Sequence, residues 1–161
     1  MYNNILLPTD GSQICEKAIA TGVYLAKALE AKVTAVYVAP KLSLSEILGA
    51  YESDILGPKD AEKAKQAMDD VEDLQESAGR KYLAWIEEFA KKVGVPYESV
   101  YIKGEAPAAG IIKVANEKEC DLIFMSAHGR SGITSVLLGS VTQKVLALAK
   151  LPVFVFRCEF A

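Results

Sequence analysis

Two segments of the sequence carry residues that could bind an anionic ligand. The first is Pro8-Thr9-Asp10-Gly11, which follows a short apolar run. The second starts at Ser126-Ala127-His128-Gly129-Arg130 and ends at Gly139-Ser140-Val141-Thr142, where a helix is predicted to begin. Free backbone N–H groups at a helix start attract anions, and glycine lets a backbone come close to a phosphate. Together with the serine and threonine hydroxyls of 139–142, these groups predict a phosphate site.

The common nucleotide fingerprints are absent from the sequence. No G-x-x-x-x-G-K-[ST] occurs, and no G-x-G-x-x-G follows a strand. Taken singly, Gly129 and Gly139 also fit ordinary turns and helix starts. Asp10 can either hydrogen-bond a ligand or cap the first turn of the following helix. Arg130 can either reach a phosphate or remain in solvent, so both interpretations stay open for each of these residues.

The sequence shows no evident enzyme chemistry and no evident metal site. His128 is the only histidine, and we expect it to lie in a loop near phosphate rather than to act as a catalyst. No nucleophile with an orienting partner accompanies it. Cys120 and Cys158 lack metal-ligand spacing, and Cys15 falls at the helical spacing of a small core residue. The sequence therefore predicts neither catalytic nor metal-ligating residues.

Composition and charge limit the class of protein. The 161 residues are 51% hydrophobic and 24% charged, which predicts one folded domain over 1–161. With 18 basic and 21 acidic residues the formal net charge is −3, which excludes a strongly basic nucleic-acid binder. The start lacks a basic n-region, and no run reaches the roughly 18 apolar residues of a membrane span. We expect a cytoplasmic protein with reduced cysteines and with neither membrane nor nucleic acid as a partner.

Short β-rich runs alternate with helical patterns along the chain. The predicted strands are 5–7, which Pro8 is expected to end, and 33–38, 97–102, 122–125 and 153–156. The predicted helices cover about 18 residues after Ser12, then 60–93, then a helix from 107 with Ala109, Ile112 and Ala115 or Asn116 inward, and finally about 140–149.

This βα alternation predicts a doubly wound α/β fold with a five-stranded parallel sheet and helices on both faces. The strand order that we expect for it is 3-2-1-4-5. Ligands of such folds bind beyond the carboxyl ends of the strands, where the strand order reverses. The first and fourth strands would be neighbours at that point. The two loops that follow them are therefore expected to line one crevice.

The segment of about 40–75 is expected to be irregular or to project. Residues 40–60 are the least regular part of the chain, and a helical pattern follows from about Asp60 to Val93. At about 1.5 Å per residue this helix would span about 50 Å, which exceeds the width of a domain of this size. Its first half either projects from the body or breaks near Gly79.

The two loops together resemble the universal stress protein family over essentially the full chain. The resemblance rests on P-T-D-G-S after the first strand, and on H-G-R-S-G followed by G-S-V-T, with nine residues between Gly129 and Gly139. It implies ATP in the crevice between the first and fourth strands, with Mg²⁺ or Mn²⁺ held mainly by the phosphates. The contacts that it implies are Pro8, Thr9, Asp10, the backbone of Val38 and Met125 for adenine and ribose, and Ser126, Gly129, Gly139 and Ser140 in the glycine motif.

Ser126 stands where ATP-binding members of the family have their first motif glycine. Serine adds a Cβ and a hydroxyl, which could obstruct the crevice or donate to the phosphate. The resemblance implies a nucleotide-binding regulatory protein of the stress response rather than an enzyme, with weak ATP hydrolysis left open. The alternative is a dimeric scaffold that binds no nucleotide. A homodimer through the last strand, 153–157, is implied as well, because its apolar edge would otherwise expose unpaired backbone groups.

Overall fold

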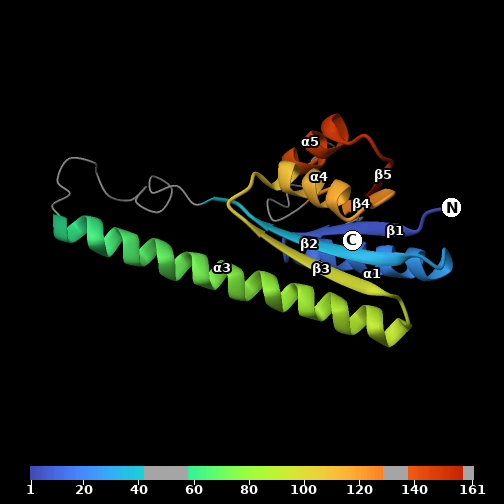
Figure 1. Ribbon diagram of the computed structural model, residues 1–161, viewed down its shortest axis with the longest axis horizontal. Coiled ribbons are helices and arrows are strands. Elements are labelled where there is room, and N and C mark those ends of the chain that lie inside the picture. Colours follow the sequence, from blue (N-terminus) through green and yellow to red (C-terminus); the bar gives the residue numbers. More distant parts are fainter. Residues whose placement is uncertain (42–57, 129–137, 158–161) are drawn as a thin grey trace.

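Five parallel strands form one sheet in the order β3-β2-β1-β4-β5, as the sequence predicts (Figure 1). The computed structural model describes residues 1–41, 58–128 and 138–157, without the side chains of 13–15 and 58–61. Its strands are β1 (Asn4–Thr9), β2 (Lys32–Ala39), β3 (Tyr97–Lys103), β4 (Leu122–Ser126) and β5 (Val153–Phe156). Its described helices are α1 (Gln13–Ala28), α3 (Pro58–Val93), α4 (Pro107–Glu117) and α5 (Ser140–Leu148).

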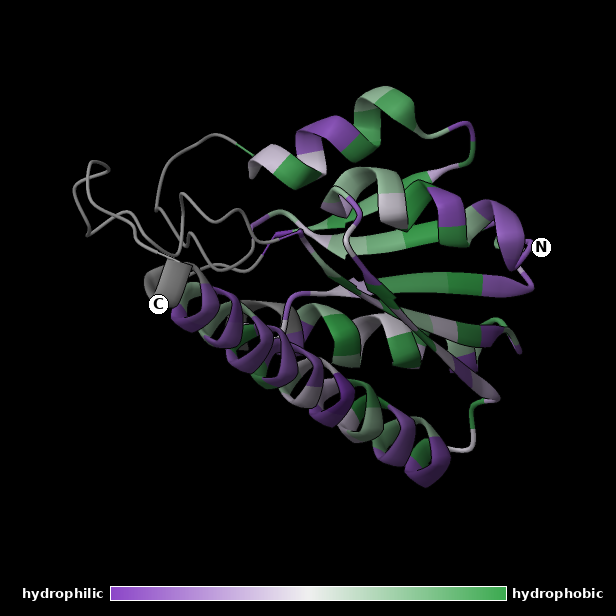
Figure 2. Cartoon of the chain, turned by 60° about the vertical axis from the view of Figure 1, so that its left-hand side comes forward, coloured by the Kyte–Doolittle hydropathy of each residue, from purple (hydrophilic) through white to green (hydrophobic). Residues whose placement is uncertain are grey.

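Helices cover both faces of the sheet, and each face has its own core (Figure 2). On one face, Ile19 and Val23 of α1 pack with Leu83 and Ile86 of α3 against strand residues. On the other face, α4 and α5 supply a second cluster, which contains Ala108, Ile111, Val114 and Val145. The central strands β1 and β4 are buried along their whole length, because helices lie on both sides of them. Their apolar runs, 5–8 and 122–125, suit burial on both faces.

The expectation that Pro8 ends the first strand is wrong, because β1 continues to Thr9. Successive residues of a strand direct their backbone groups to opposite neighbours. The carbonyl of Asn3 accepts the Lys32 N–H of β2, whereas the carbonyl of Asn4 accepts the Asp121 N–H beside β4. By this alternation the backbone of Pro8 faces β4. The N–H that proline lacks removes no hydrogen bond between strands there, since the pairing of β1 with β4 has already ended.

The pairing of β1 with β4 is short, and this opens the sheet at its carboxyl edge. β1 and β2 pair over six residues, from Asn4↔Lys32 to Thr9↔Tyr37. β1 and β4 pair only at Ile5↔Leu122 and Leu6↔Ile123, although both strands continue for three more residues. The unpaired strand ends lie where the strand order reverses, which is the expected place for a ligand site.

The inner face of α4 differs from the predicted one by one position. The buried residues are Ala108, Gly110, Ile111, Val114 and Ala115, whereas Ala109 and Asn116 are exposed. Small or apolar residues occur in adjacent pairs along this helix, so its sequence fits two helical registers equally well. Contact with the sheet selects the register that contains Ile111 and Val114.

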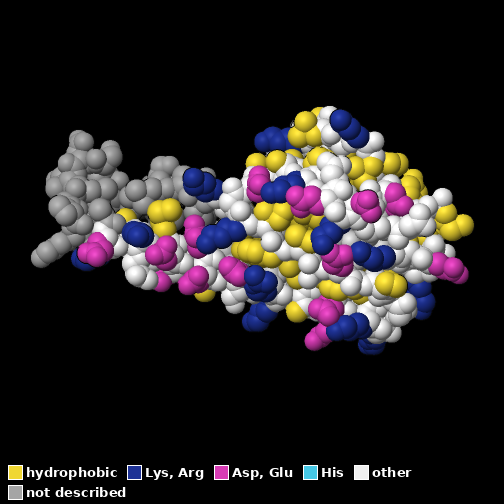
Figure 3. All heavy atoms as spheres, viewed as in Figure 1, with side chains coloured by type: hydrophobic (Ala, Val, Ile, Leu, Met, Phe, Trp, Pro, Cys, Tyr) yellow, Lys and Arg dark blue, Asp and Glu magenta, His cyan; other side chains and the backbone are white. Residues whose placement is uncertain are grey.

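The helix α3 is continuous for 36 residues and passes Gly79 without a break. At about 1.5 Å per residue it is about 54 Å long, and Figure 1 shows its first part extending past the end of the sheet. Charged side chains of both signs lie along this projecting part (Figure 3). Residues 42–57, where irregular structure is expected, lie outside the described residues.

None of the described helices combines the length and the apolar character that crossing a membrane requires.

Candidate functional site

A cavity of about 350 Å³ lies at the carboxyl ends of β1, β2 and β4, beside the starts of α4 and α5. Every predicted site residue that the structure describes lines it: Pro8, Thr9, Asp10, Val38, Met125, Ser126, His128, Gly139, Ser140, Val141 and Thr142. Gly129 and Arg130 lie outside the described residues. The fold thus brings the two predicted loops to one cavity, whereas their contact with a ligand stays a prediction.

Five lining residues were not predicted: Val36, Tyr37, Pro40, Pro107 and Ile111. Val36 could have been predicted from the alternation of β2, because it shares a face of the strand with Val38, which was predicted. Pro107 and Ile111 are one helical turn apart on α4. They were not predicted from the sequence, because the inner face predicted for this helix was wrong.

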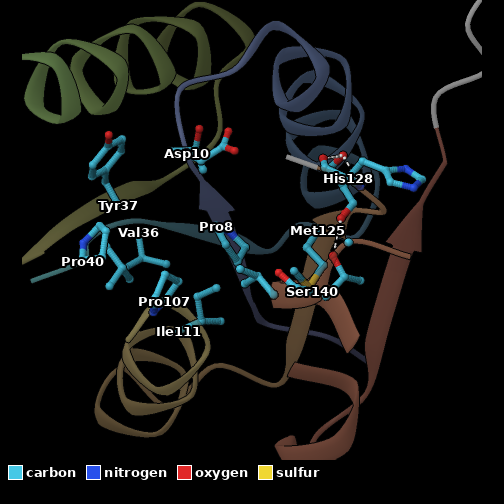
Figure 4. A pocket seen from close by; sticks show the side chains of 16 residues that line it. Pro8, Asp10, Val36, Tyr37, Pro40, Pro107, Ile111, Met125, His128 and Ser140 are labelled. Atoms are coloured by element: carbon cyan, nitrogen blue, oxygen red, sulfur yellow. Dashed lines mark hydrogen bonds between the residues drawn. The ribbon is translucent and has the colours of Figure 1, made fainter. Parts of the chain in front are cut away.

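The two ends of the cavity differ in polarity (Figure 4). Val36, Pro40, Pro107 and Ile111 lie together at one end, and His128 and Ser140 lie at the other. Pro8 and Met125 lie between the two ends, as Figure 4 shows. The cavity therefore offers an apolar compartment next to a polar one.

Ser126 closes a tight turn at the end of β4. Its hydroxyl donates to the backbone carbonyl of His128 with an O···O distance of 2.6 Å. The same oxygen accepts the backbone N–H of His128 at 3.3 Å. A hydroxyl has a single hydrogen to donate, and here that hydrogen is used within the turn. Ser126 thus holds the backbone of 126–128 in place.

The start of α5 is tied to the end of β4. The Gly139 N–H donates to the carbonyl of Ala127 at 2.8 Å, and the buried Thr142 hydroxyl lies 3.1 Å from the carbonyl oxygen of Ser126. This use of the Thr142 hydroxyl leaves Ser140 as the exposed hydroxyl of the helix start. The N–H groups of Ser140, Val141 and Thr142 have no acceptor within the helix, because the first turn of any helix lacks them.

Asp10 lines the cavity and braces the turn before α1, whereas its hydrogen bond to a ligand stays a prediction. Its carboxylate oxygen accepts the Ser12 N–H at 2.9 Å, and the Thr9 hydroxyl oxygen accepts the Gly11 N–H at 3.1 Å. Gly11 has a φ of +76°, a conformation that side chains with a Cβ rarely adopt. The turn 9–12 is therefore held by its own side chains.

The backbone of Val38 faces the open part of the sheet. Lys32 donates its N–H to Asn3 next to β1, and Val33 donates to Pro96 next to β3. The alternation along β2 therefore directs the backbone groups of Val38 toward β1, which ends at Thr9, opposite Tyr37. The carbonyl of Val38 thus lies at the edge of the cavity, where it can accept a hydrogen bond.

Charge at the cavity is sparse among the lining residues that the structure describes. Asp10 and His128 are present there, and neither lysine nor arginine is. A positive potential comes from the N-terminal end of α5, where helix dipoles leave a partial positive charge. Within the described ranges, no group of three or more His, Cys, Asp or Glu side chains could hold a metal ion.

Comparisons with known proteins place the chain in one family. The family model described as the universal stress protein family matches residues 1–157. The universal stress protein YxiE of Bacillus subtilis is 31% identical over 159 residues, which cover 98% of this chain and all of that protein. The universal stress protein MJ0531 of Methanocaldococcus jannaschii is 29% identical over 157 residues, covering 98% of this chain and 83% of the relative.

Solved structures share the fold along the whole chain. The structure of protein MJ0577 of Methanocaldococcus jannaschii superposes with a TM-score of 0.80 at 24% identity, covering 100% of this chain and 99% of that one. A universal stress protein of Archaeoglobus fulgidus, solved in complex with dAMP, has a TM-score of 0.58 at 20% identity, covering 96% and 97% of the two chains. An Arabidopsis thaliana family member with AMP bound has a TM-score of 0.64 at 15% identity, covering 98% and 92%. The family model and the relatives agree: the chain belongs to the universal stress protein family.

Proposed function

We propose that this protein binds an adenine nucleotide, ATP, in the cavity between β1 and β4 and that it acts as a nucleotide-dependent regulator. The observation that carries the proposal is the cavity itself, which is apolar at one end and bordered by a helix N-terminus at the other. Its volume of about 350 Å³ is within the range of small-molecule sites. Two structurally similar family members were solved with dAMP and AMP, which supports an adenine nucleotide as the ligand.

The apolar end suits the adenine ring. Val36, Pro40, Pro107 and Ile111 can pack against a flat base, and burying its faces is favourable. The carbonyl of Val38 would accept a hydrogen bond from the amino group at C6 of adenine, a group that guanine replaces with a carbonyl oxygen. Asp10 and Thr9, which also line the cavity, would then face the ribose. This arrangement predicts a preference for adenine over guanine.

The polar end suits phosphates. The N–H groups of 140–142 and the Ser140 hydroxyl would bind phosphate oxygens, and the helix N-terminus would offset part of their charge. Gly129 and Arg130, which precede this helix, would complete the binding loop. Mg²⁺ or Mn²⁺ would be held mainly by the phosphates, because Mg²⁺ retains several waters and needs few protein ligands when phosphates are present.

We further propose binding without turnover, in a cytoplasmic protein. His128 would contact a phosphate as a hydrogen-bond donor and not as a general base. The alternative is a scaffold that binds no nucleotide. The hydrogen bond of the Ser126 hydroxyl supports nucleotide binding over the scaffold. The adjacent backbone holds this hydroxyl, so it need not obstruct a nucleotide.

The first test is the nucleotide content and affinity of the purified protein. Native mass spectrometry should detect an adenine nucleotide that is retained through purification, and titration calorimetry with Mg²⁺ should give tighter binding for ATP than for GTP. Ser140→Ala should weaken ATP binding about fivefold, which corresponds to the loss of one hydroxyl donor worth roughly 1 kcal/mol. Gly139→Val should weaken it more, because a branched side chain would fill the approach to the helix start.

Ser77→Ala is the matched control for Ser140→Ala, since Ser77 is exposed on α3 and remote from the cavity. Its ATP affinity should equal that of the wild type. Equal titration curves for the wild type and Gly139→Val would refute the assigned phosphate end. A wild-type protein that neither retains nor binds any adenine nucleotide would favour the scaffold.

A further inference from the structure

The ring of Tyr82, on the long helix α3, packs directly on the turn that presents Asp10 to the cavity. A Cβ added to Gly11 would lie 2.5 Å from both Cδ2 and Cε2 of Tyr82, so the ring occupies the space that a side chain at position 11 would need. Residue 82 lies on the side of the sheet that α1 and α3 cover, away from the α4 and α5 face. The contact therefore reaches the site from outside the cavity.

The turn under this ring is short. Its hydrogen bonds include Gly11 N–H to the Thr9 hydroxyl oxygen and Ser12 N–H to the Asp10 carboxylate. The positive φ of Gly11 is a conformation that glycine adopts but does not prefer over others, so a free turn would sample several states. A ring packed on Gly11 removes the space that those other states need.

A second contact, at Gly79, fixes the position of α3 on the sheet so that Tyr82 reaches the turn 9–12. Gly79 is one turn earlier on the same side of the helix, and a Cβ there would lie 2.8 Å from Cδ1 of Tyr37 and from Cε2 of Tyr101. Tyr37 is buried and also lines the cavity. Through positions 79 and 82, α3 therefore packs on two segments that form the cavity wall.

We propose that Tyr82 is a positioning residue of the nucleotide site: its ring holds the turn 9–12 so that Asp10 and Thr9 face the ligand. This inference rests on the proposed nucleotide binding and adds a residue that does not line the cavity. The turn borders the nucleoside part of the site, and α5 borders the phosphates. Loss of Tyr82 should therefore weaken adenosine and ATP by the same factor, whereas Ser140→Ala should weaken ATP alone.

The experiment compares adenosine and Mg-ATP titrations of the wild type, Tyr82→Ala, Tyr82→Phe and Trp85→Ala. Tyr82→Ala should weaken both ligands about fivefold, as expected for one misplaced hydrogen-bonding side chain. Tyr82→Phe should bind like the wild type, because the contact with Gly11 is made by ring carbons. Trp85→Ala is the matched control, since Trp85 is a partly exposed ring in the next turn of α3 that stacks on Phe89.

Hydrogen exchange of the ligand-free protein gives an independent measurement. The amides of Gly11 and Ser12 should exchange faster in Tyr82→Ala, and those of Ala127 and Gly139, across the cavity, should not change. A general loss of stability would accelerate all four. If Tyr82→Ala does not fold, Tyr82→Leu retains apolar bulk and still removes the flat ring.

One outcome would overturn the role of Tyr82 and leave the proposed function intact. In it the wild type binds adenosine and ATP, and Tyr82→Ala has the same affinities and the same exchange rates as the wild type. A wild type that binds neither ligand would overturn the proposed function and the role of Tyr82 with it. An affinity loss in Tyr82→Ala confined to ATP would also overturn the role, because it would place the effect at the phosphates.

Discussion

The hydroxyl of Ser126 holds the backbone at the polar end of the cavity. Ser126 lines the cavity, and its hydroxyl bonds twice to the backbone of His128. Side chains of serine commonly close such short turns. Ser126 therefore restrains the backbone of 126–128, which a glycine at this position would leave freer.

Ser126→Gly should weaken ATP binding, because it removes both bonds to His128 and adds backbone freedom that the ligand must restrict. The expected loss is about fivefold, near the value of one hydrogen bond. Ser126→Ala keeps the Cβ and removes only the hydroxyl, so it should fall between the glycine variant and the wild type. Calorimetric titration with Mg-ATP measures all three. Tighter binding by the glycine variant would mean that the Cβ obstructs the cavity.

At the scale of elements, the close approach of α3 to the sheet depends on Gly79. The rings of Tyr37 and Tyr101 stack with centroids 5.8 Å apart and an interplanar angle of 7°, and the Arg80 guanidinium lies 5.2 Å from the centroid of the Tyr101 ring. The helix carries no side chain at position 79, and the two rings occupy that space. Lys103 at the end of β3 also pairs with Glu72 of α3, which holds the same stretch of helix from the side.

Gly79→Ala should lower the melting temperature. In a free helix the change would stabilise by about 1 kcal/mol, because alanine has the higher helix propensity. Here the new Cβ would lie 2.8 Å from ring carbons of Tyr37 and Tyr101, and Tyr37 is only 4% exposed and has little room to move. Overpacking of this kind costs about 1–3 kcal/mol, so the loss should exceed the gain.

Thermal unfolding followed by circular dichroism measures this effect. Ser77→Ala is the matched control, because Ser77 is exposed two positions away on the same helix and should follow helix propensity alone. A Gly79→Ala protein that is more stable than the wild type would show that the rings move aside at little cost.

At the scale of the whole molecule, the open edge of the sheet at β5 is the feature that favours pairing with a partner. Among the described strands β5 pairs only with β4, and the Phe154 side chain is 50% exposed. The carbonyls of Pro152 and Phe156 accept N–H groups of Ile123 and Ala127. By alternation, the backbone groups of Val153 and Val155 face the open edge. This edge is apolar and unprotected by charge along its four residues, which is a hazard for an isolated chain.

We therefore predict a homodimer through 153–157, in which the twofold-related copies of β5 satisfy each other's backbone groups. Light scattering at micromolar concentration should give twice the chain mass of 17.4 kDa. Val155→Pro should shift the mass toward the monomer, since it removes an N–H from the open edge and leaves the ladder to β4 intact. Arg157→Ala, at the end of the same segment, should remain dimeric, because exposed charges contribute little. A monomeric wild type would refute this interface.

The sequence by itself determined the order of the elements, and it predicted the strand order that the structure confirms and a place for the site. An apolar run such as 122–125 or a turn residue such as Gly11 determines the structure of a few adjacent residues. Strands and turns of this kind can therefore be recognised in the sequence. Parallel strands joined by helices then have few possible arrangements. For the same reason the sequence predicted that the loops after β1 and β4 would meet, and the structure brings their described residues to one cavity.

Only the tertiary structure decided the features that depend on contacts between distant segments. The passage of β1 through Pro8 depends on where its pairing with β4 stops, and the inner face of α4 depends on which of two helical registers the sheet accepts. The ring of Tyr82 reaches Gly11 across 71 positions of sequence, and no pattern near either residue predicts this contact. Local patterns specify secondary structure because their interactions span a few residues, whereas close packing is set by all the chain segments that share one space.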